Sequence, residues 1–157
     1  MWSGLDKKES CNAIINTNMC QTAVISNTVK RLGRRSYTHR MDVATPGGYN
    51  EAQLSRLNRE LDSLYDLIYN DWNTITEQDY AVFGGQLSLL VATLKLLYDD
   101  CRKSSLRRVM HHEVERLGMN YSALHELNSD IVHFRIKAPH NTELQSMMSQ
   151  AATVINR

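Results

Sequence analysis

Apolar residues recur at alternating intervals of three and four over most of the chain after residue 50. The first run has spacings of 3, 4, 3, 4 and 4 and comprises Leu54, Leu57, Leu61, Leu64, Ile68 and Trp72. This spacing places the side chains on one face of a helix, so the pattern predicts a helix over roughly residues 50–72. The other positions of the segment are mostly charged, which is typical of a helix with one buried face.

A second and more apolar run has spacings of 4, 3, 4, 3 and 4 and comprises Phe83, Leu87, Leu90, Leu94, Leu97 and Cys101. Four further apolar residues widen this stripe, namely Leu89, Val91, Leu96 and Tyr98. We therefore expect a helix over residues 76–117, with a capping box at Thr74 or Thr76, to be the most buried element. The register changes after Cys101, which predicts either a kink or a new helix at Ser104-Ser105.

Gly118 is predicted to end this second helix, because glycine is favoured just beyond a helix C-terminus. Shorter apolar stripes predict further helices near residues 121–137 and 142–156, separated at Pro139. No strand-like alternation of useful length is present. The sequence therefore predicts an all-α fold, with residues 45–157 forming a helical bundle built on a long antiparallel helical hairpin.

Residues 1–44 show weaker periodicity and precede the turn signal Pro46-Gly47-Gly48. Residues 1–40 contain seven basic and two acidic residues, although the net charge of the whole chain is only +1. We expect a basic, weakly structured N-terminal arm over residues 1–44 that is dispensable for folding. Such an arm suits nucleic acid, an anionic membrane or an acidic partner, and its composition also resembles that of an organellar presequence.

The cysteines and the missing motifs narrow the classes of function. Cys11, Cys20 and Cys101 show neither a C-x-x-C motif nor zinc-like spacing to histidine, so free thiols in the cytoplasm are expected. The longest apolar stretch, residues 87–98, is shorter than the roughly 20 residues of a membrane span, so no membrane is expected. Phosphate-binding glycine loops and nucleophile motifs are also missing, so we expect no cofactor and no small-molecule ligand.

The segment 113–130 resembles the helix-turn-helix of small DNA-binding repressors. Leu117, Gly118 and Met119 occupy the positions of the turn, and residues 122–124 those of the following helix. The resemblance implies a small DNA-binding accessory or regulatory protein, whereas a helix that ends at Gly118 before another helix produces the same pattern. The possible nucleic-acid contacts are Lys30, Arg31, Arg34, Arg35, Arg107, Arg108, Asn120, Tyr121 and Ser122.

Arg107 and His112 are separated by four residues. This spacing is similar to the Arg-x(4–6)-His motif of the all-helical HEPN ribonucleases. The resemblance implies a histidine that acts as general acid or base and an arginine that steadies the phosphate. An exposed basic helix face is the alternative reading of the same residues.

Many potential metal ligands occur within the 23 residues from 111 to 133, among them His111, His112, Glu113, Glu115, His125, Asp130 and His133. The chain contains neither an H-E-x-x-H nor an E-x-x-H motif. Its acidic residues also fall mostly outside the apolar stripes, so we expect surface residues and no metal.

No set of titratable residues has the spacing that a known type of reaction requires, so no catalytic residue is expected. The second helix is apolar on more than one side, which a single neighbouring helix cannot cover. We therefore expect a non-catalytic interaction or assembly subunit that acts through helix packing of the kind seen in coiled coils. Its partner would be another protein or a second copy, and in the latter case we expect a homo-oligomer, namely a dimer.

Overall fold

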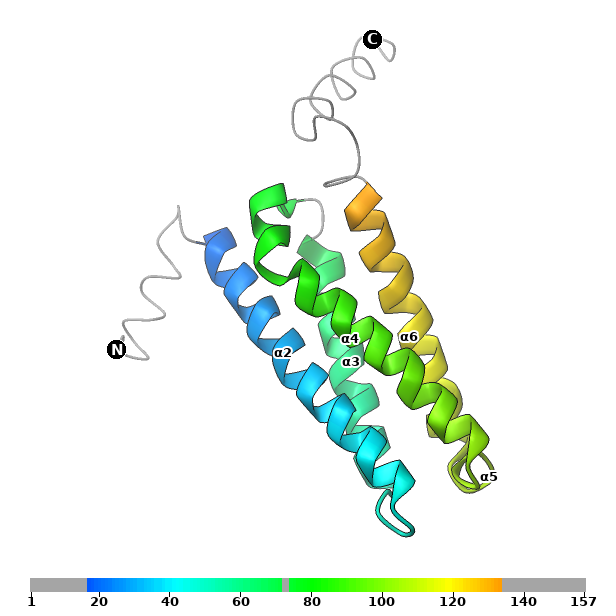
Figure 1. The fold of residues 1–157 in the computed structure, drawn as a ribbon. Coiled ribbons are helices and arrows are strands. Elements are labelled where there is room, and N and C mark those ends of the chain that lie inside the picture. The colour runs from blue at the N-terminus through cyan, green and yellow to red at the C-terminus, as the bar shows by residue number, and fades with distance from the viewer. Residues whose placement is uncertain (1–16, 72–73, 134–157) are drawn as a thin grey trace, which may run out of the picture.

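The structure, a computed structural model, describes residues 17–71 and 74–133 (Figure 1). The elements are α2 (Thr17–Ala44), α3 (Glu51–Asp71), α4 (Glu77–Lys103), the short α5 (Leu106–Val109) and α6 (His111–Ile131). No strand occurs among the described residues. The predicted all-α helical bundle is therefore confirmed.

The four long helices alternate in direction along the chain (Figure 1). Helix α4 packs most extensively against α2, which runs parallel to it, and then against the antiparallel α6. Helix α3 completes the bundle through contacts with α2 and α6. The two helices of the predicted hairpin, α3 and α4, do run in opposite directions, but the principal neighbours of α4 are α2 and α6.

The core is built from the apolar stripes that the sequence predicts. The stripe of α3 from Leu54 to Ile68 and that of α4 from Phe83 to Cys101 are fully buried. Helix α4 begins with the second of the two predicted capping boxes. In it Asp79 N donates to Thr76 Oγ1 at 3.1 Å and Thr76 N donates to Asp79 Oδ2 at 3.0 Å, which satisfies two amides that the helix leaves unpaired.

The prediction of a weakly structured arm over residues 1–44 is wrong for residues 17–44, which form α2. Ile25, Val29 and Leu32 are buried in the core, so we now expect α2 to be needed for folding. The same face continues the three-four spacing through polar residues, which are also buried: Thr22, Ser26, Ser36 and His39. Because polar residues occupy about half of the stripe, the apolar periodicity of α2 is weak. Residues 1–16 lie outside the described residues.

The helix predicted over residues 76–117 is interrupted, as its change of register indicates. Helix α4 ends at Lys103, where Ser104 Oγ donates to Cys101 O at 2.9 Å and accepts from Leu106 N at 3.1 Å. Helices α5 and α6 follow Ser104 and Ser105, which we call the serine turn. Residues 121–131 of the helix predicted over 121–137 are thus part of α6. Residues 134–137 of that prediction, and the whole helix predicted over 142–156, lie outside the described residues.

The prediction that Gly118 ends a helix is wrong, because α6 runs through it without a break. A Cβ at Gly118 would lie 2.6 Å from Cζ of Tyr98, on the neighbouring α4. Gly118 therefore makes room for an aromatic ring between two helices.

Gly84, near the other end of the contact between α4 and α6, also makes room for an aromatic ring, which here belongs to Tyr80 of α4 itself. A Cβ at Gly84 would lie 2.2 Å from Cε2 of Tyr80. The Tyr80 hydroxyl donates to Asn128 Oδ1 at 2.7 Å, and Asn128 Nδ2 donates to Ser88 Oγ at 3.1 Å. These two hydrogen bonds, of which the one between Tyr80 and Asn128 is buried, hold the ring against Gly84 and tie α4 to α6.

The adjacent glycines of α4 allow a matched test of this packing. We expect Gly84→Ala to lower the free energy of unfolding by about 1–3 kcal/mol, because the added methyl group displaces the Tyr80 ring. Gly85→Ala should raise it by up to about 1 kcal/mol, because no atom lies within 4 Å of the new Cβ and alanine favours the helix. Urea unfolding of both variants measures the difference, and equal effects would contradict this packing.

The role of α2 in the core is tested by Leu32→Ala, with the half-exposed Val24→Ala as its control. We expect Leu32→Ala to lower the free energy of unfolding by about 2–5 kcal/mol through lost burial and a cavity. Val24→Ala should change it by less than about 1 kcal/mol. A chain that starts at Met41 should lose its cooperative melt in circular dichroism, and retention of that melt would show that α2 is dispensable.

Candidate interaction surface

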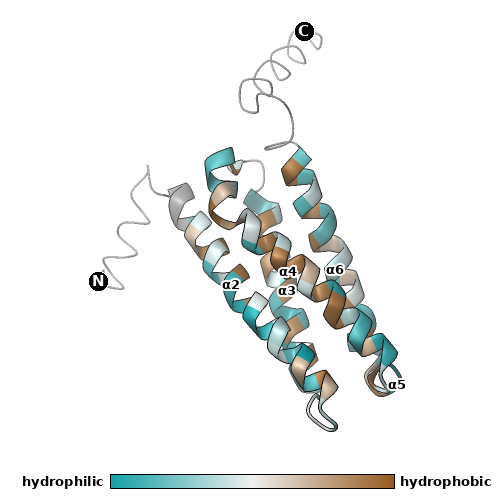
Figure 2. Ribbon diagram, viewed as in Figure 1, coloured by the Kyte–Doolittle hydropathy of each residue, from teal (hydrophilic) through white to brown (hydrophobic). Residues whose placement is uncertain are grey.

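An apolar stripe runs along the outer face of α4. Val82, Leu89 and Leu96 are spaced seven residues apart and are 55%, 59% and 45% exposed. Gly85 and Ala92 lie between them on the same face and are exposed too. We call these five residues the α4 outer stripe. Figure 2 shows hydrophobic residues along much of α4, and this stripe is the part of them that the bundle does not cover.

A groove between α2 and α4 borders this stripe on one side. Its volume is about 620 Å³, and Leu89, Leu90 and Tyr37 contribute its apolar lining. Lys30 and Arg34 also line it, and none of its lining residues in the described ranges 17–71 and 74–133 is acidic. Neither of these two cations has a carboxylate partner among the described residues. The groove therefore combines an apolar floor with a basic rim.

A second hollow, of about 530 Å³, borders the α4 outer stripe on the side of α6. Ala92 and Leu96 of the stripe line it together with Tyr121 and His125 of α6, whose rings stack with centroids 5.7 Å apart. The α4 outer stripe is thus a ridge between two hollows. A ridge of this kind can pack against another helix while the hollows receive the flanking side chains of that helix.

Helix α4 is long and apolar enough to cross a membrane when judged by length and composition alone. However, 44% of its most apolar window is buried inside the bundle, and the core helix of a bundle meets the same two criteria. The apolar stretch of residues 87–98, from which no membrane was expected, lies within this helix and includes the polar residues Ser88, Thr93 and Lys95. Packing against α2 and α6 accounts for the buried side of α4 but leaves the α4 outer stripe uncovered.

The helix-turn-helix predicted over residues 113–130 is wrong in its geometry, because this segment is part of the single helix α6. Asn120, a predicted nucleic-acid contact, is buried and donates to Asn58 Oδ1 at 3.0 Å. Tyr121 is half-buried, whereas Ser122 is exposed. No turn sets a recognition helix at an angle to a supporting helix, as that motif requires.

The predicted basic contacts fall into three groups. Arg31 and Arg35 form ion pairs with Glu60 of α3, whereas Lys30 and Arg34 line the groove between α2 and α4. The third group, Arg107 and Arg108, lies at the end of the bundle where α4 and α6 meet. The structure therefore does not gather the residues predicted to contact nucleic acid on one surface.

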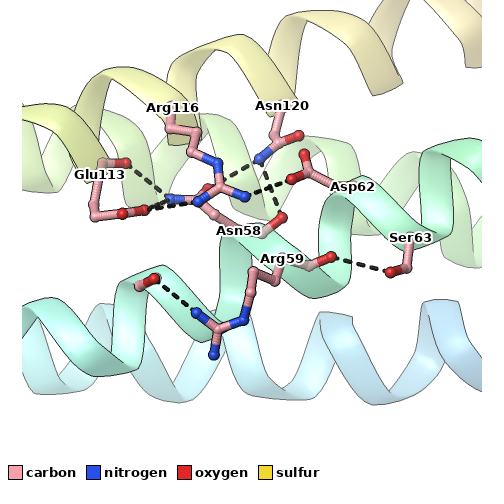
Figure 3. A network of polar contacts seen from close by, with 8 residues as sticks. Asn58, Arg59, Asp62, Ser63, Glu113, Arg116 and Asn120 are labelled. Atoms are coloured by element: carbon pink, nitrogen blue, oxygen red, sulfur yellow. Dashed lines mark hydrogen bonds and ion pairs between the residues drawn. The ribbon is translucent and has the colours of Figure 1, made fainter.

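A polar network between α3 and α6 was not predicted from the sequence (Figure 3). Asn58 is fully buried, and its Nδ2 donates to the backbone oxygen of Glu113 at 3.0 Å and to Glu113 Oε1 at 2.9 Å. Arg116 bridges Asp62 and Glu113, and its hydrogen bond with Asp62 raises the pKa of the guanidinium. Because these groups satisfy one another, the network serves to align α3 with α6.

The residues of the HEPN-like motif line different hollows. Arg107 lines a hollow with Arg102 and Arg108, whereas His112 lines another that is formed with α3. The structure therefore does not bring Arg107 and His112 together on one site. The candidate metal ligands are also dispersed, since residues 17–71 and 74–133 contain no group of three or more potential ligands that could hold a metal ion.

The titratable side chains deepest in the bundle lie near the turn between α2 and α3. The hydroxyl of Tyr49 and Nδ1 of His39 are 2.6 Å apart, and both side chains are buried. Burial lowers the pKa of His39 to about 4, so the ring is neutral at pH 7 and its hydrogen bond with the tyrosine hydroxyl joins two uncharged groups. Burial also raises the pKa of Cys101 to about 12, which keeps this thiol protonated as expected of a core cysteine.

Acid should destabilise the bundle through His39. In the unfolded chain a histidine has a pKa near 6.5, so between about pH 6.5 and pH 4 the unfolded state binds a proton that the folded state does not. The free energy of unfolding should therefore fall by about 2–3 kcal/mol as the pH is lowered from 7 to 4. His39→Gln, which keeps an acceptor but does not titrate, should show a fall smaller by that amount. Urea unfolding at several pH values measures both slopes, and identical slopes would contradict the assignment.

No protein-family model, curated protein or solved structure matches this chain. Three features of its surface are candidates for binding, namely the α4 outer stripe, the basic groove beside it and the arginines at the end of the bundle.

Proposed function

We propose that this protein is a non-catalytic helical assembly subunit that binds a helix of a partner protein. The binding surface is the α4 outer stripe together with the groove between α2 and α4. One observation carries this proposal, namely the seven-residue spacing of the exposed Val82, Leu89 and Leu96. This spacing keeps one face of an α-helix in contact with another helix over several turns.

The dimensions of the stripe suit a helix as the ligand. Residues 82–96 span about 21 Å along the axis of α4 at 1.5 Å per residue. The small residues Gly85 and Ala92 alternate with the large ones, so the backbone of a second helix can approach closely between the three apolar side chains. Covering these side chains removes apolar surface from water, which is the main driving force for association.

The charge of the groove indicates the chemistry of the partner. Lys30 and Arg34 form a basic rim without a lining carboxylate, so acidic residues beside the apolar face of the partner helix would complement it. A two-fold dimer would instead place the same surface of both copies in contact. Because the described residues that line the stripe, the groove and the second hollow include no carboxylate, a second copy would offer none to Lys30 and Arg34, which favours a different protein over a second copy.

The proposed absence of catalysis is supported by the surroundings of the reactive side chains. Cys101 and His39 are buried in the core, and burial holds both in their neutral forms at pH 7. The carboxylates of Asp62 and Glu113 are engaged with Arg116. Arg107 and His112 line separate hollows.

The partner surface can be tested with two designed helical peptides of about 21 residues that share one leucine stripe. One carries glutamate beside the stripe and the other carries lysine. We expect the glutamate peptide to bind at least about tenfold more tightly in isothermal titration calorimetry, because it complements Lys30 and Arg34. Leu89→Lys should weaken that binding by at least about tenfold, because it places a charge in the apolar contact.

Tyr69→Lys is the matched control, since Tyr69 is an exposed apolar residue of α3 that is distant in sequence from the stripe and the groove. It should bind the glutamate peptide like the parent protein, and circular dichroism should show both variants folded. Failure of both peptides to bind would contradict the proposal. A concentration-dependent dimer that Leu89→Lys abolishes in light scattering would keep the role of helix packing but make the second copy the partner.

A further inference from the structure

A cluster of basic side chains lies at the end of the bundle where α4 ends and, after the short α5, α6 begins (Figure 1 shows these helices). The last turn of α4, the turn at Ser104 and Ser105, α5 and the start of α6 line an open surface hollow of about 400 Å³ there. Its lining consists of Arg102, Ser104, Ser105, Arg107, Arg108 and His111. We call these six residues the basic corner. No acidic residue of the described part of the chain lines it, so these residues make the local potential positive.

The arginines of the basic corner differ from those elsewhere in the bundle. Within the described part of the chain, Arg102, Arg107 and Arg108 form no ion pair with a carboxylate. By contrast, Arg40 at the same end of the bundle pairs with Asp100 at 2.8 Å, and Arg116 pairs with Asp62. The fold thus brings three guanidinium groups around one hollow and leaves their mutual repulsion without compensation.

The shape of the basic corner is set by internal contacts that require no ligand. The guanidinium carbon of Arg102 lies 5.3 Å from the centroid of the Tyr98 ring, a cation–π arrangement that holds the side chain on α4. The Ser104 hydroxyl ties the turn to Cys101 and Leu106, and Met110 N donates to Leu106 O at 2.7 Å. The backbone that presents Arg107 and Arg108 is therefore ordered before any ligand binds.

We propose that the basic corner binds phosphate groups of a nucleic-acid backbone. Guanidinium groups pair with phosphate oxygens in a bidentate manner, and the exposed Ser105 hydroxyl and the His111 ring add hydrogen-bonding capacity. Three arginines carry more charge than a single phosphodiester would neutralise, which favours a chain of phosphates. The site makes no base contact in this proposal, so binding depends on salt and little on sequence.

A membrane surface is the less favoured source of phosphate. Peripheral binding to a bilayer combines basic residues with several exposed apolar side chains that enter the lipid. Between Ser104 and His111, Val109 is the one large apolar side chain that is exposed, at 73%, while Met110 is buried. This site is separate from the α4 outer stripe, so it does not depend on the function proposed above.

The test uses the full chain and fluorescein-labelled single-stranded RNA and duplex DNA of about 20 nucleotides or base pairs. Fluorescence anisotropy at low salt should show binding to at least one of them. Arg107→Glu with Arg108→Glu should weaken binding by at least about tenfold and reduce the slope of log K against log salt by about two. Arg56→Glu with Arg59→Glu, at two exposed residues of α3, has the same change of net charge outside the basic corner and should weaken binding by no more than about threefold.

Two further binding measurements identify the source of the phosphate. Inorganic phosphate at the same ionic strength as added chloride should displace little of the nucleic acid, because one phosphate engages only part of the corner. Vesicles of phosphatidylserine and phosphatidylcholine should bind less than the nucleic acid does. The proposal is overturned by an absence of nucleic-acid binding at low salt, by equal losses in the two double variants, or by binding to vesicles alone. Full displacement by inorganic phosphate at low millimolar concentration would overturn the assignment to a chain of phosphates.

Discussion

The packing of α4 between α2 and α6 is the constraint on which the rest of the structure depends. Helix α4 has apolar residues on more than one side, and two neighbouring helices bury the side that runs from Phe83 to Cys101. Gly118 of α6 leaves room for the ring of Tyr98 of α4, and Gly84 leaves room for the ring of Tyr80, whose hydroxyl binds Asn128 of α6. The packing of α4 against α6 thus depends on positions without a side chain as well as on apolar ones.

The surface features that we interpret as functional follow from this packing. Since two neighbours cannot enclose α4, the α4 outer stripe stays exposed and borders the basic groove of α2. The abrupt end of α4 at Lys103, followed by the serine turn, places three arginines around one hollow. Helix packing and anion binding are therefore assigned to different parts of the molecule, one along its side and one at its end.

Much of the fold could be predicted from spacing alone, and the errors have physical causes. The stripes of α3 and α4 were found because nearly every buried position in them is apolar. Helix α2 was missed because Thr22, Ser26, Ser36 and His39 occupy buried positions of its stripe. Of the candidate sites, the excess apolar character of α4 was visible in the sequence, whereas the convergence of Arg102 with Arg107 and Arg108 depends on how the serine turn folds.

The sequence by itself determined the class of fold, the face that each of α3 and α4 buries, and the change of register near Ser104, because each follows from local helical periodicity. Tertiary structure alone decided which helices are neighbours, and this in turn decided the structural roles of several residues. Gly118 lies inside a helix, where the ring of Tyr98 of α4 occupies the space that a side chain at this position would need. Asn120 is buried with its amide satisfied, because Asn58 of α3 accepts its hydrogen bond. Such roles depend on contacts between residues far apart in the chain, which periodicity along a single helix does not encode.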